Sequence, residues 1–217
     1  MHARSGSAFG QRWARWASCL ALVLLAACAS APPPAPAPRV GSGEACLADL
    51  TRNNISYQIP TIPVSVGPCQ IDTPIRTSGL AIRWNQPATM SCLLGDVLMR
   101  FEREVVEPDA IKILGQRAVS ERNLGAYSCR VEASSRHVMS QHALGRAIDL
   151  AGWTLADGSR VEVEKDWTDR GPRGRFLHAV AEGACHYFSV VLTPASNKLH
   201  HDHFHLDIGP DHLCSIG

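Results

Sequence analysis

Six cysteines spread across residues 44–217 place the strongest constraint on what this chain can fold into. An even number of cysteines is typical of a disulfide framework if the domain is exported. Proximity along the chain favours the pairings Cys46–Cys69 and Cys185–Cys214. Cys92 and Cys129 then remain as the third pair. None of these pairs has CxxC spacing, which argues against a redox motif or a cysteine-ligated metal site.

The first 27 residues predict the export that such a framework needs. Three arginines and no acidic residue precede an apolar run from Ala17 to Ala27. The run is shorter than the roughly 20 residues that span a bilayer. It ends in "LLAAC", which resembles a bacterial lipobox, so we expect Cys28 to become the lipidated first residue. An ordinary cleaved signal is the alternative. By resemblance to known sorting rules, Ala29 favours the outer membrane, facing the periplasm.

Residues 28–43 are dominated by proline and alanine and predict an extended tether without a core. Residues 44–217 are then one domain. The whole chain carries a formal charge of +1, and loss of the three signal arginines leaves 18 basic and 20 acidic residues, a charge of −2. A nucleic-acid partner would need a basic face, so we expect none.

The residue pattern of the domain predicts an α+β fold with helices packed on a mostly antiparallel sheet. Residues 46–82 are rich in prolines and predict a loop-rich wrapping segment, and Pro87 to about Val106 has helical apolar spacing that ends at "EPDA". A second helix is expected from Gly174 to about Cys185. Strands are predicted at residues 110–116, 125–133, 145–155, 156–164, 187–193 and 203–209.

Two stretches carry donors for a metal ion. In "SQHALGRAIDL" His142 and Asp149 offer a nitrogen and an oxygen, and Gly145 between them permits a turn with positive φ. In "LHHDHFHLD" (199–207) the histidines at 201, 203 and 205 share one face if the segment is a strand. Imidazole and carboxylate suit zinc, and catalytic zinc sites usually keep three protein ligands. A set of unrelated surface residues is the alternative.

"SQHALGRAID" fits the SxHxxGxAxD signature of a metallopeptidase group. This group includes D-Ala-D-Ala carboxypeptidases, murein endopeptidases and the zinc domain of hedgehog proteins, and "HFH" fits its closing HxH element. The stretch from "GAYSCR" to "HHDHFHLDIGP" resembles the extensin-like C-terminal domain of exported bacterial proteins. The resemblance implies a hedgehog-like zinc fold, with one Zn²⁺ per chain held by His142, Asp149 and His205.

The same resemblance implies the remaining catalytic roles. Asp202 or His203 is the general base, and strand parity points Asp202 away from His205 unless the strand begins after it. Arg130 matches an arginine that binds the substrate or polarises its carbonyl, and Ser140 contacts a substrate carboxylate or orients the loop. The other histidines are expected at the rim or in structural positions. Trp153 and Trp167 either line a groove or are buried.

These features predict an enzyme, a zinc metallopeptidase in which a metal-activated water attacks the substrate. Peptidoglycan lies within reach of a tethered periplasmic domain, so the expected substrate is a cross-link or a stem peptide. The alternatives are a zinc-containing lipoprotein that binds the cell wall without catalysis, or an envelope scaffold.

Overall fold

A computed structural model of the chain describes residues 43–60, 65–133 and 135–217. The predicted export signal (1–27), the lipidated Cys28 and all but the last residue of the predicted tether (28–43) lie outside these ranges. Within the described ranges, no helix is both long enough and apolar enough to cross a membrane.

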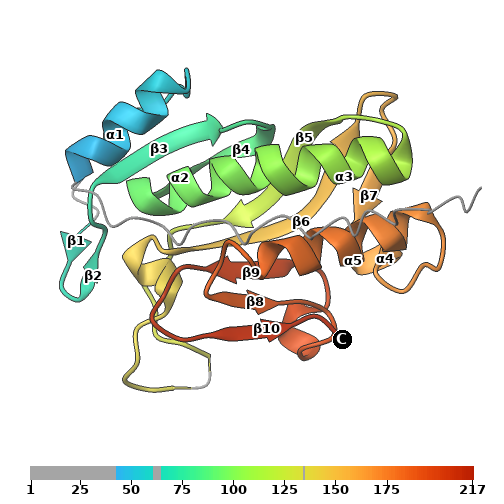
Figure 1. Cartoon of the computed structure of the whole chain (residues 1–217). Coiled ribbons are helices and arrows are strands. Elements are labelled where there is room, and N and C mark those ends of the chain that lie inside the picture. Colours follow the sequence, from blue (N-terminus) through green and yellow to red (C-terminus); the bar gives the residue numbers. More distant parts are fainter. Residues whose placement is uncertain (1–42, 61–64, 134) are drawn as a thin grey trace, which may run out of the picture. The chain divides into compact units, whose positions relative to one another are not determined.

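The described residues form strands and helices in separate stretches of the chain, which confirms the α+β class (Figure 1). The strands are β1 (Ser65–Val66), β2 (Cys69–Gln70), β3 (Pro74–Gly79), β4 (Arg83–Ser91), β5 (Ala118–Gly125), β6 (Ala147–Leu155), β7 (Arg160–Glu162), β8 (Val190–Leu192), β9 (Phe204–Asp207) and β10 (Leu213–Ser215). The helices are α1 (Gly43–Arg52), α2 (Cys92–Phe101), α3 (Glu107–Asp109), α4 (Val163–Asp166) and α5 (Pro172–Ala184), with π-helical turns η1 (Glu102–Val106) and η2 (Ala110–Leu114) and 3-10 turns η3 (Gln141–Leu144) and η4 (Lys198–His200).

The main sheet has the strand order β10-β8-β9-β6-β5-β4-β3, and β7 also pairs with β6. Two of its pairings are parallel, β4 with β5 and β8 with β10. The sheet is therefore mixed, because these two parallel pairings stand beside five antiparallel ones. Each parallel pair is joined by a long connection, since a tight hairpin can join only antiparallel strands. The helix after β4 makes the first connection, and the chain through β9 makes the second.

The two faces of the sheet have different chemistry. Five side chains on one face of the central strands are fully buried: Ile148, Leu150, Val191, Phe204 and Leu206. They share a hydrophobic core with residues of α2 and α5, which run across the sheet in Figure 1. Because neighbours on a strand point to opposite faces, Asp149 and His205 lie on the other face.

The predicted helix from Pro87 to Val106 is shifted and extended. Residues 83–91 are instead strand β4, which pairs with β3, and the helix begins at Cys92 after the N-cap Ser91. It does not stop at "EPDA" but runs through α3 and η2 to Gly115, whose φ of 67° closes it. A π-helical turn precedes Pro108, and in it the Glu107 N–H bonds the Glu102 carbonyl oxygen five residues back. The helix then continues past the proline, which has no N–H to donate.

Two predicted strands are wrong. Residues 110–116 belong to the end of that helix. Most of residues 125–133 form a loop after β5, stabilised by a bridge between Val131 and Met139. The segment 46–82 contributes more than a wrapping loop, because it holds α1 and the edge strand β3. The remaining predicted elements are confirmed as β6, β7, α5, β8 and β9, with shifted ends.

Three disulfides are present in the domain, and one of the predicted pairings is confirmed, Cys185–Cys214. The other two predicted pairings are wrong: the bonds are Cys46–Cys92 and Cys69–Cys129. The first fastens α1 to the start of α2, and the second joins β2 to the loop after β5. Sequence proximity failed because the partners are 46 and 60 residues apart and meet only through tertiary packing.

Candidate metal centre

His142 is fixed by the turn that precedes β6. The Ser140 hydroxyl accepts a hydrogen bond from the His142 N–H and caps η3, and Gly145 closes η3 with a φ of 62°. A side chain at Gly145 would come within 2.9 Å of Ile71. The His142 ring is buried and its Nδ1 lies 2.9 Å from the Ala126 carbonyl oxygen. Since a carbonyl only accepts, Nδ1 carries the proton and the Nε2 lone pair is free for another partner.

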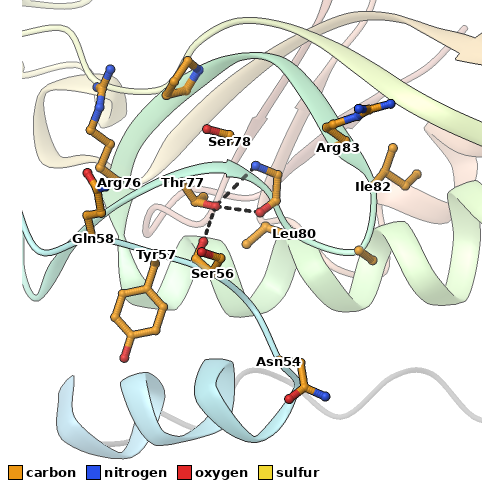
Figure 2. Close-up of a pocket in the computed structure, with 13 residues that line it drawn as sticks. Asn54, Ser56, Tyr57, Gln58, Arg76, Thr77, Ser78, Leu80, Ile82 and Arg83 are labelled. Atoms are coloured by element: carbon orange, nitrogen blue, oxygen red, sulfur yellow. Dashed lines mark hydrogen bonds between the residues drawn. The ribbon is translucent and has the colours of Figure 1, made fainter.

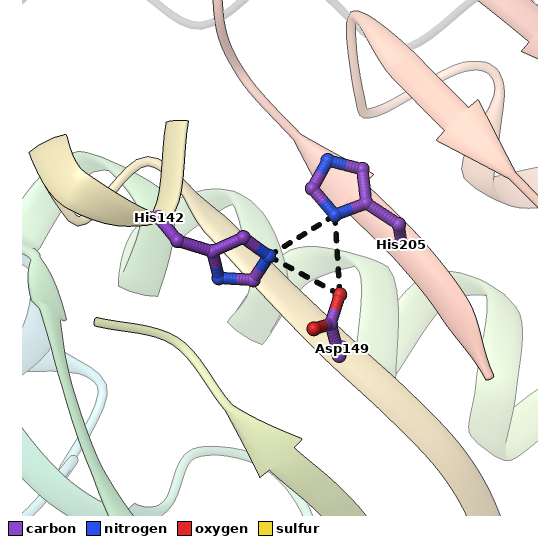
Figure 3. A group of neighbouring side chains, drawn as sticks. All are labelled: His142, Asp149 and His205. Atoms are coloured by element: carbon purple, nitrogen blue, oxygen red, sulfur yellow. Dashed lines mark hydrogen bonds and ion pairs between the residues drawn. The ribbon is translucent and has the colours of Figure 1, made fainter. Parts of the chain in front are cut away.

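The Nε2 atom of His142 lies close to two further potential metal ligands, which face one another on neighbouring strands. Asp149 on β6 and His205 on β9 are directly opposite in the antiparallel register. His142 Nε2 lies 3.1 Å from His205 Nδ1 and 3.3 Å from Asp149 Oδ1, and the latter two atoms are 3.1 Å apart (Figure 3). The structure thus brings all three predicted ligands together, with their donor atoms within 4.8 Å of one another.

The electrostatics of this triad favour a cation. Burial alone would raise the pKa of Asp149, but hydrogen bonds and charge from His142 and His205 lower it well below its usual range. Burial likewise opposes a charge on His205, yet Asp149 and Asp207 raise the pKa of His205 to about 9. An ionised carboxylate between two imidazoles is a suitable ligand set for a divalent ion of the zinc type.

Asp207 is a site residue that the sequence analysis missed. Its Oδ2 lies 3.1 Å from His205 Nε2, the ring nitrogen that faces away from the triad. Its Oδ1 accepts a hydrogen bond from the Gly209 N–H at 2.8 Å, so the buried carboxylate is itself held in place. A carboxylate behind a histidine ligand fixes the tautomer and the ring orientation. The signal was in the sequence, because alternation on a strand puts residue 207 on the face of residue 205.

Asp202 and His203 form a pair beside the triad. Asp202 Oδ1 lies 2.8 Å from His203 Nδ1, and His203 Nε2 lies 3.6 Å from Asp149 Oδ1. The hydrogen bond to His203 lowers the pKa of Asp202, which keeps the carboxylate ionised. β9 begins only at Phe204, so the alternation of a strand does not apply to Asp202. The imidazole of His203 therefore faces the triad, and the carboxylate of Asp202 lies behind it.

The triad opens into a pocket of about 560 Å³. Arg130, Ser140, His200 and His203 line it together with the three triad residues. Arg130 is exposed, and no side-chain hydrogen bond or ion pair holds it within the described part of the chain. Ser140 is 6% exposed and serves the structure as the cap described above.

The remaining histidines are arranged around this centre or away from it. The ring centre of His200 is 5.2 Å from that of His203, and burial, with the nearby His203 and His205, lowers the pKa of His200 to about 4. His201 contacts the Lys198 carbonyl oxygen and His178 stacks on Trp167. His137, His186 and His212 are exposed. Trp153 is buried, and Trp167, largely buried, lines a separate pocket with His178 rather than the pocket above the triad.

A second pocket, of about 580 Å³, lies between the segment 54–58 and the β3–β4 hairpin (Figure 2). Its described lining contains Arg76 and Arg83 but no imidazole, thiol or carboxylate. Thr77 there is bonded to backbone atoms of Ser56 and Gly79. This pocket therefore offers no metal ligands, in contrast to the pocket above the triad.

Fold and site together define an α+β domain with a candidate metal centre of two histidines and one aspartate. The chain belongs to the family described as extensin-like protein C-terminus, whose model matches residues 44–215. No curated protein and no solved structure matches the chain in the same comparisons.

Proposed function

We propose that the protein is a zinc-dependent peptidoglycan peptidase, either an endopeptidase that cuts cross-links or a D,D-carboxypeptidase that trims stem peptides. One observation carries this proposal: the His142, Asp149 and His205 donor atoms converge within 4.8 Å at the base of an open pocket. A purely structural zinc site usually has four protein ligands, whereas three ligands beneath a pocket are typical of a catalytic one.

The spacing of the donors supports zinc as the ion. For zinc–ligand bonds of about 2.0–2.2 Å in a tetrahedron, two ligand atoms are separated by roughly 3.3–3.6 Å. The three separations in the triad are 3.1, 3.1 and 3.3 Å. When bound, zinc would lower the pKa of a coordinated water toward neutrality and polarise a substrate carbonyl.

The residues around the triad divide the remaining work. His203 Nε2 faces the centre, so His203 takes the proton from the nucleophilic water and passes it to the leaving amine. Asp202 is a positioning residue, since it holds His203 Nδ1–H and stabilises the charged imidazole. The side chain of Arg130 makes no hydrogen bond or ion pair with the described residues and lines the pocket. It therefore binds the substrate or its developing oxyanion.

The substrate is inferred from the expected location and from the family resemblance. An export signal, a lipidated Cys28 and a proline-rich tether would place the domain in the periplasm, anchored to the outer membrane. Peptidoglycan is the peptide-bearing polymer there. The SxHxxGxAxD and HxH elements are shared with peptidases that cleave its D-amino-acid bonds, which supports a hedgehog-like zinc fold and the same reaction class by analogy.

The test is digestion of purified peptidoglycan by the zinc-loaded protein, with muropeptides separated and weighed by mass spectrometry. Loss of dimers with gain of monomers identifies an endopeptidase, and loss of a terminal alanine identifies a carboxypeptidase. His142→Ala should abolish either change. His212→Ala is the matched control, because His212 is exposed and does not line the pocket. An unchanged muropeptide profile from folded, zinc-bound protein would favour a non-catalytic wall-binding lipoprotein or scaffold.

A further inference from the structure

The floor of the pocket beside the triad is apolar. His205 is opposite Leu192 of β8 in the antiparallel register, and Asp207 is opposite Val190. Val190 in turn is in register with Leu213 of the edge strand β10. Residues in register on neighbouring strands share a face, so Val190, Leu192 and Leu213 extend the face that carries the metal ligands. We call these three residues the apolar shelf.

The orientation of the shelf is fixed by the opposite face of the same strands. Val191 is fully buried in the core, so Val190 and Leu192 point the other way. Cys214 is bonded to Cys185 at the end of α5, which draws Cys214 toward the helices. Leu213 must therefore point toward the pocket. Consistent with this, all three shelf residues line the pocket above the triad.

The shelf leaves apolar surface uncovered. Leu213 is 54% exposed and Leu199, on the pocket wall formed by η4, is 66% exposed. Exposed leucines that continue the floor of a pocket are a feature of ligand recognition rather than of folding. The pocket lining also contains polar side chains outside the triad, among them Arg130, Glu132 and Gln141.

The distance from the metal ligands to the shelf matches a short stretch of peptide. Neighbouring strands are about 4.8 Å apart, so Leu192 lies roughly one strand spacing from His205. Leu213 is two strands away and in register with Val190, two residues along from Leu192, which places it roughly 12 Å from His205. Since an extended peptide advances about 3.3 Å per residue, a side chain that rests on the shelf belongs to a residue within about one to four positions of the bond held at the triad.

We propose that the apolar shelf is a specificity subsite that binds an uncharged aliphatic side chain of a peptide substrate, next to the bond that is cut. This inference rests on the proposed peptidase function and adds the chemistry of one substrate position. The polar residues of the pocket lining then bind the carbonyl and carboxylate groups of the same peptide.

Equilibrium binding tests the shelf separately from catalysis. The probes are N-acetylated tripeptide amides Ala-X-Ala, with X as glycine, glutamate or either enantiomer of leucine, titrated into the zinc-loaded protein. A peptide with at least one leucine enantiomer should bind about tenfold more tightly than the glycine peptide, since burial of a leucine side chain gives a factor of this size or more. The glutamate peptide should gain nothing.

Leu213→Ser should remove most of the leucine preference and leave the affinity for the glycine peptide unchanged. Because Leu213 is exposed, the substitution should not unfold the domain. Ile111→Ser is the matched control, since Ile111 is 50% exposed on η2 and does not line this pocket. Equal affinity for all peptides, or a leucine preference that survives Leu213→Ser, would overturn the shelf proposal. Leucine-selective binding without any cleavage of peptidoglycan would support the shelf and count against the peptidase function.

Discussion

Asp202 Oδ1 lies 2.8 Å from Nδ1 of His203, and the Nε2 of the same ring lies 3.6 Å from the ligand oxygen of Asp149. The sequence left Asp202 and His203 as alternatives for the general base. In the structure the two side chains form a hydrogen-bonded pair. The imidazole faces the centre, while the carboxylate holds the imidazole from behind. This arrangement favours His203 as the base and gives Asp202 a positioning role.

His203→Gln should lower kcat by about 10²–10⁴-fold, the usual contribution of a general acid–base group. Asp202→Asn should lower kcat by about 10–100-fold, because it removes only the orienting partner. Both variants should keep their bound zinc, which elemental analysis measures beside muropeptide turnover. A larger loss from Asp202→Asn than from His203→Gln would assign the base to Asp202.

Asp207→Asn should weaken zinc binding by about 10–100-fold, since the carboxylate behind His205 orients this ligand. The measurement is the zinc dissociation constant by competition with a chelator, together with the visible spectrum of the cobalt-substituted protein. Asp211→Asn is the control, because Asp211 lines the same pocket and its side chain has no hydrogen bond or ion pair with the described residues. Equal zinc affinities for both variants would exclude a positioning role of Asp207.

Removal of the Cys69–Cys129 disulfide should destabilise the domain and loosen one wall of the pocket. The bond fastens β2 to the loop that carries Arg130, one residue after Cys129. A paired Cys69→Ala and Cys129→Ala variant should lose about 2–5 kcal/mol in the free energy of unfolding. Amide exchange in residues 126–133 should accelerate more than in β6. The matched variant without Cys185 and Cys214 should instead leave exchange in residues 126–133 unchanged.

Glu121 should make the domain less stable at high pH. It is fully buried, its Oε2 accepts a hydrogen bond from Trp153 Nε1, and burial raises its pKa from 4.5 to about 8. The unfolded chain therefore releases this proton at a lower pH than the folded chain. The stabilisation is complete below about pH 4.5 and is lost as the pH rises toward about 8.

The free energy of unfolding should consequently fall between about pH 5 and 8, by at most about 1.4 kcal/mol per pH unit for the proton of Glu121. Burial and the neighbouring Glu121 also raise the pKa of the buried Glu102, so this second carboxyl contributes with the same sign. Glu121→Gln should reduce the pH dependence, and denaturant unfolding at several pH values measures it. Glu164→Gln, an exposed position on α4, should keep the wild-type slope. A Glu121→Gln curve parallel to the wild type would show that this carboxyl does not cause the pH dependence.

The convergence of His142, Asp149 and His205 was predictable from sequence because each contributing element carries a local signal. Gly145 marks the turn between the first two ligands, and alternation around Ile148 and Leu150 predicts the strand that holds Asp149. Asp207 obeys the same alternation and was missed because the family motif ends at His205. His142 and Asp149 thus followed from local patterns and the choice of His205 from the family resemblance, whereas the residue behind His205 required the strand to be followed two positions further.

The errors occurred where tertiary packing decides the structure. Residues 110–116 have a β-prone composition, but they complete a helix that a π-helical turn carries past Pro108. Cys46 and Cys92 are far apart in sequence and are joined because α1 packs on α2. The shelf could not be predicted either, since it depends on the register of β8 and β10, which no local pattern encodes.

The most direct test of the central claim is muropeptide release by the same protein sample before and after removal of metal. We expect a chelator to abolish cleavage, one equivalent of zinc per chain to restore it, and His142→Ala to remain inactive at that zinc concentration. Cleavage that persists in metal-free protein, or that His142→Ala retains, would contradict a zinc peptidase built on His142, Asp149 and His205.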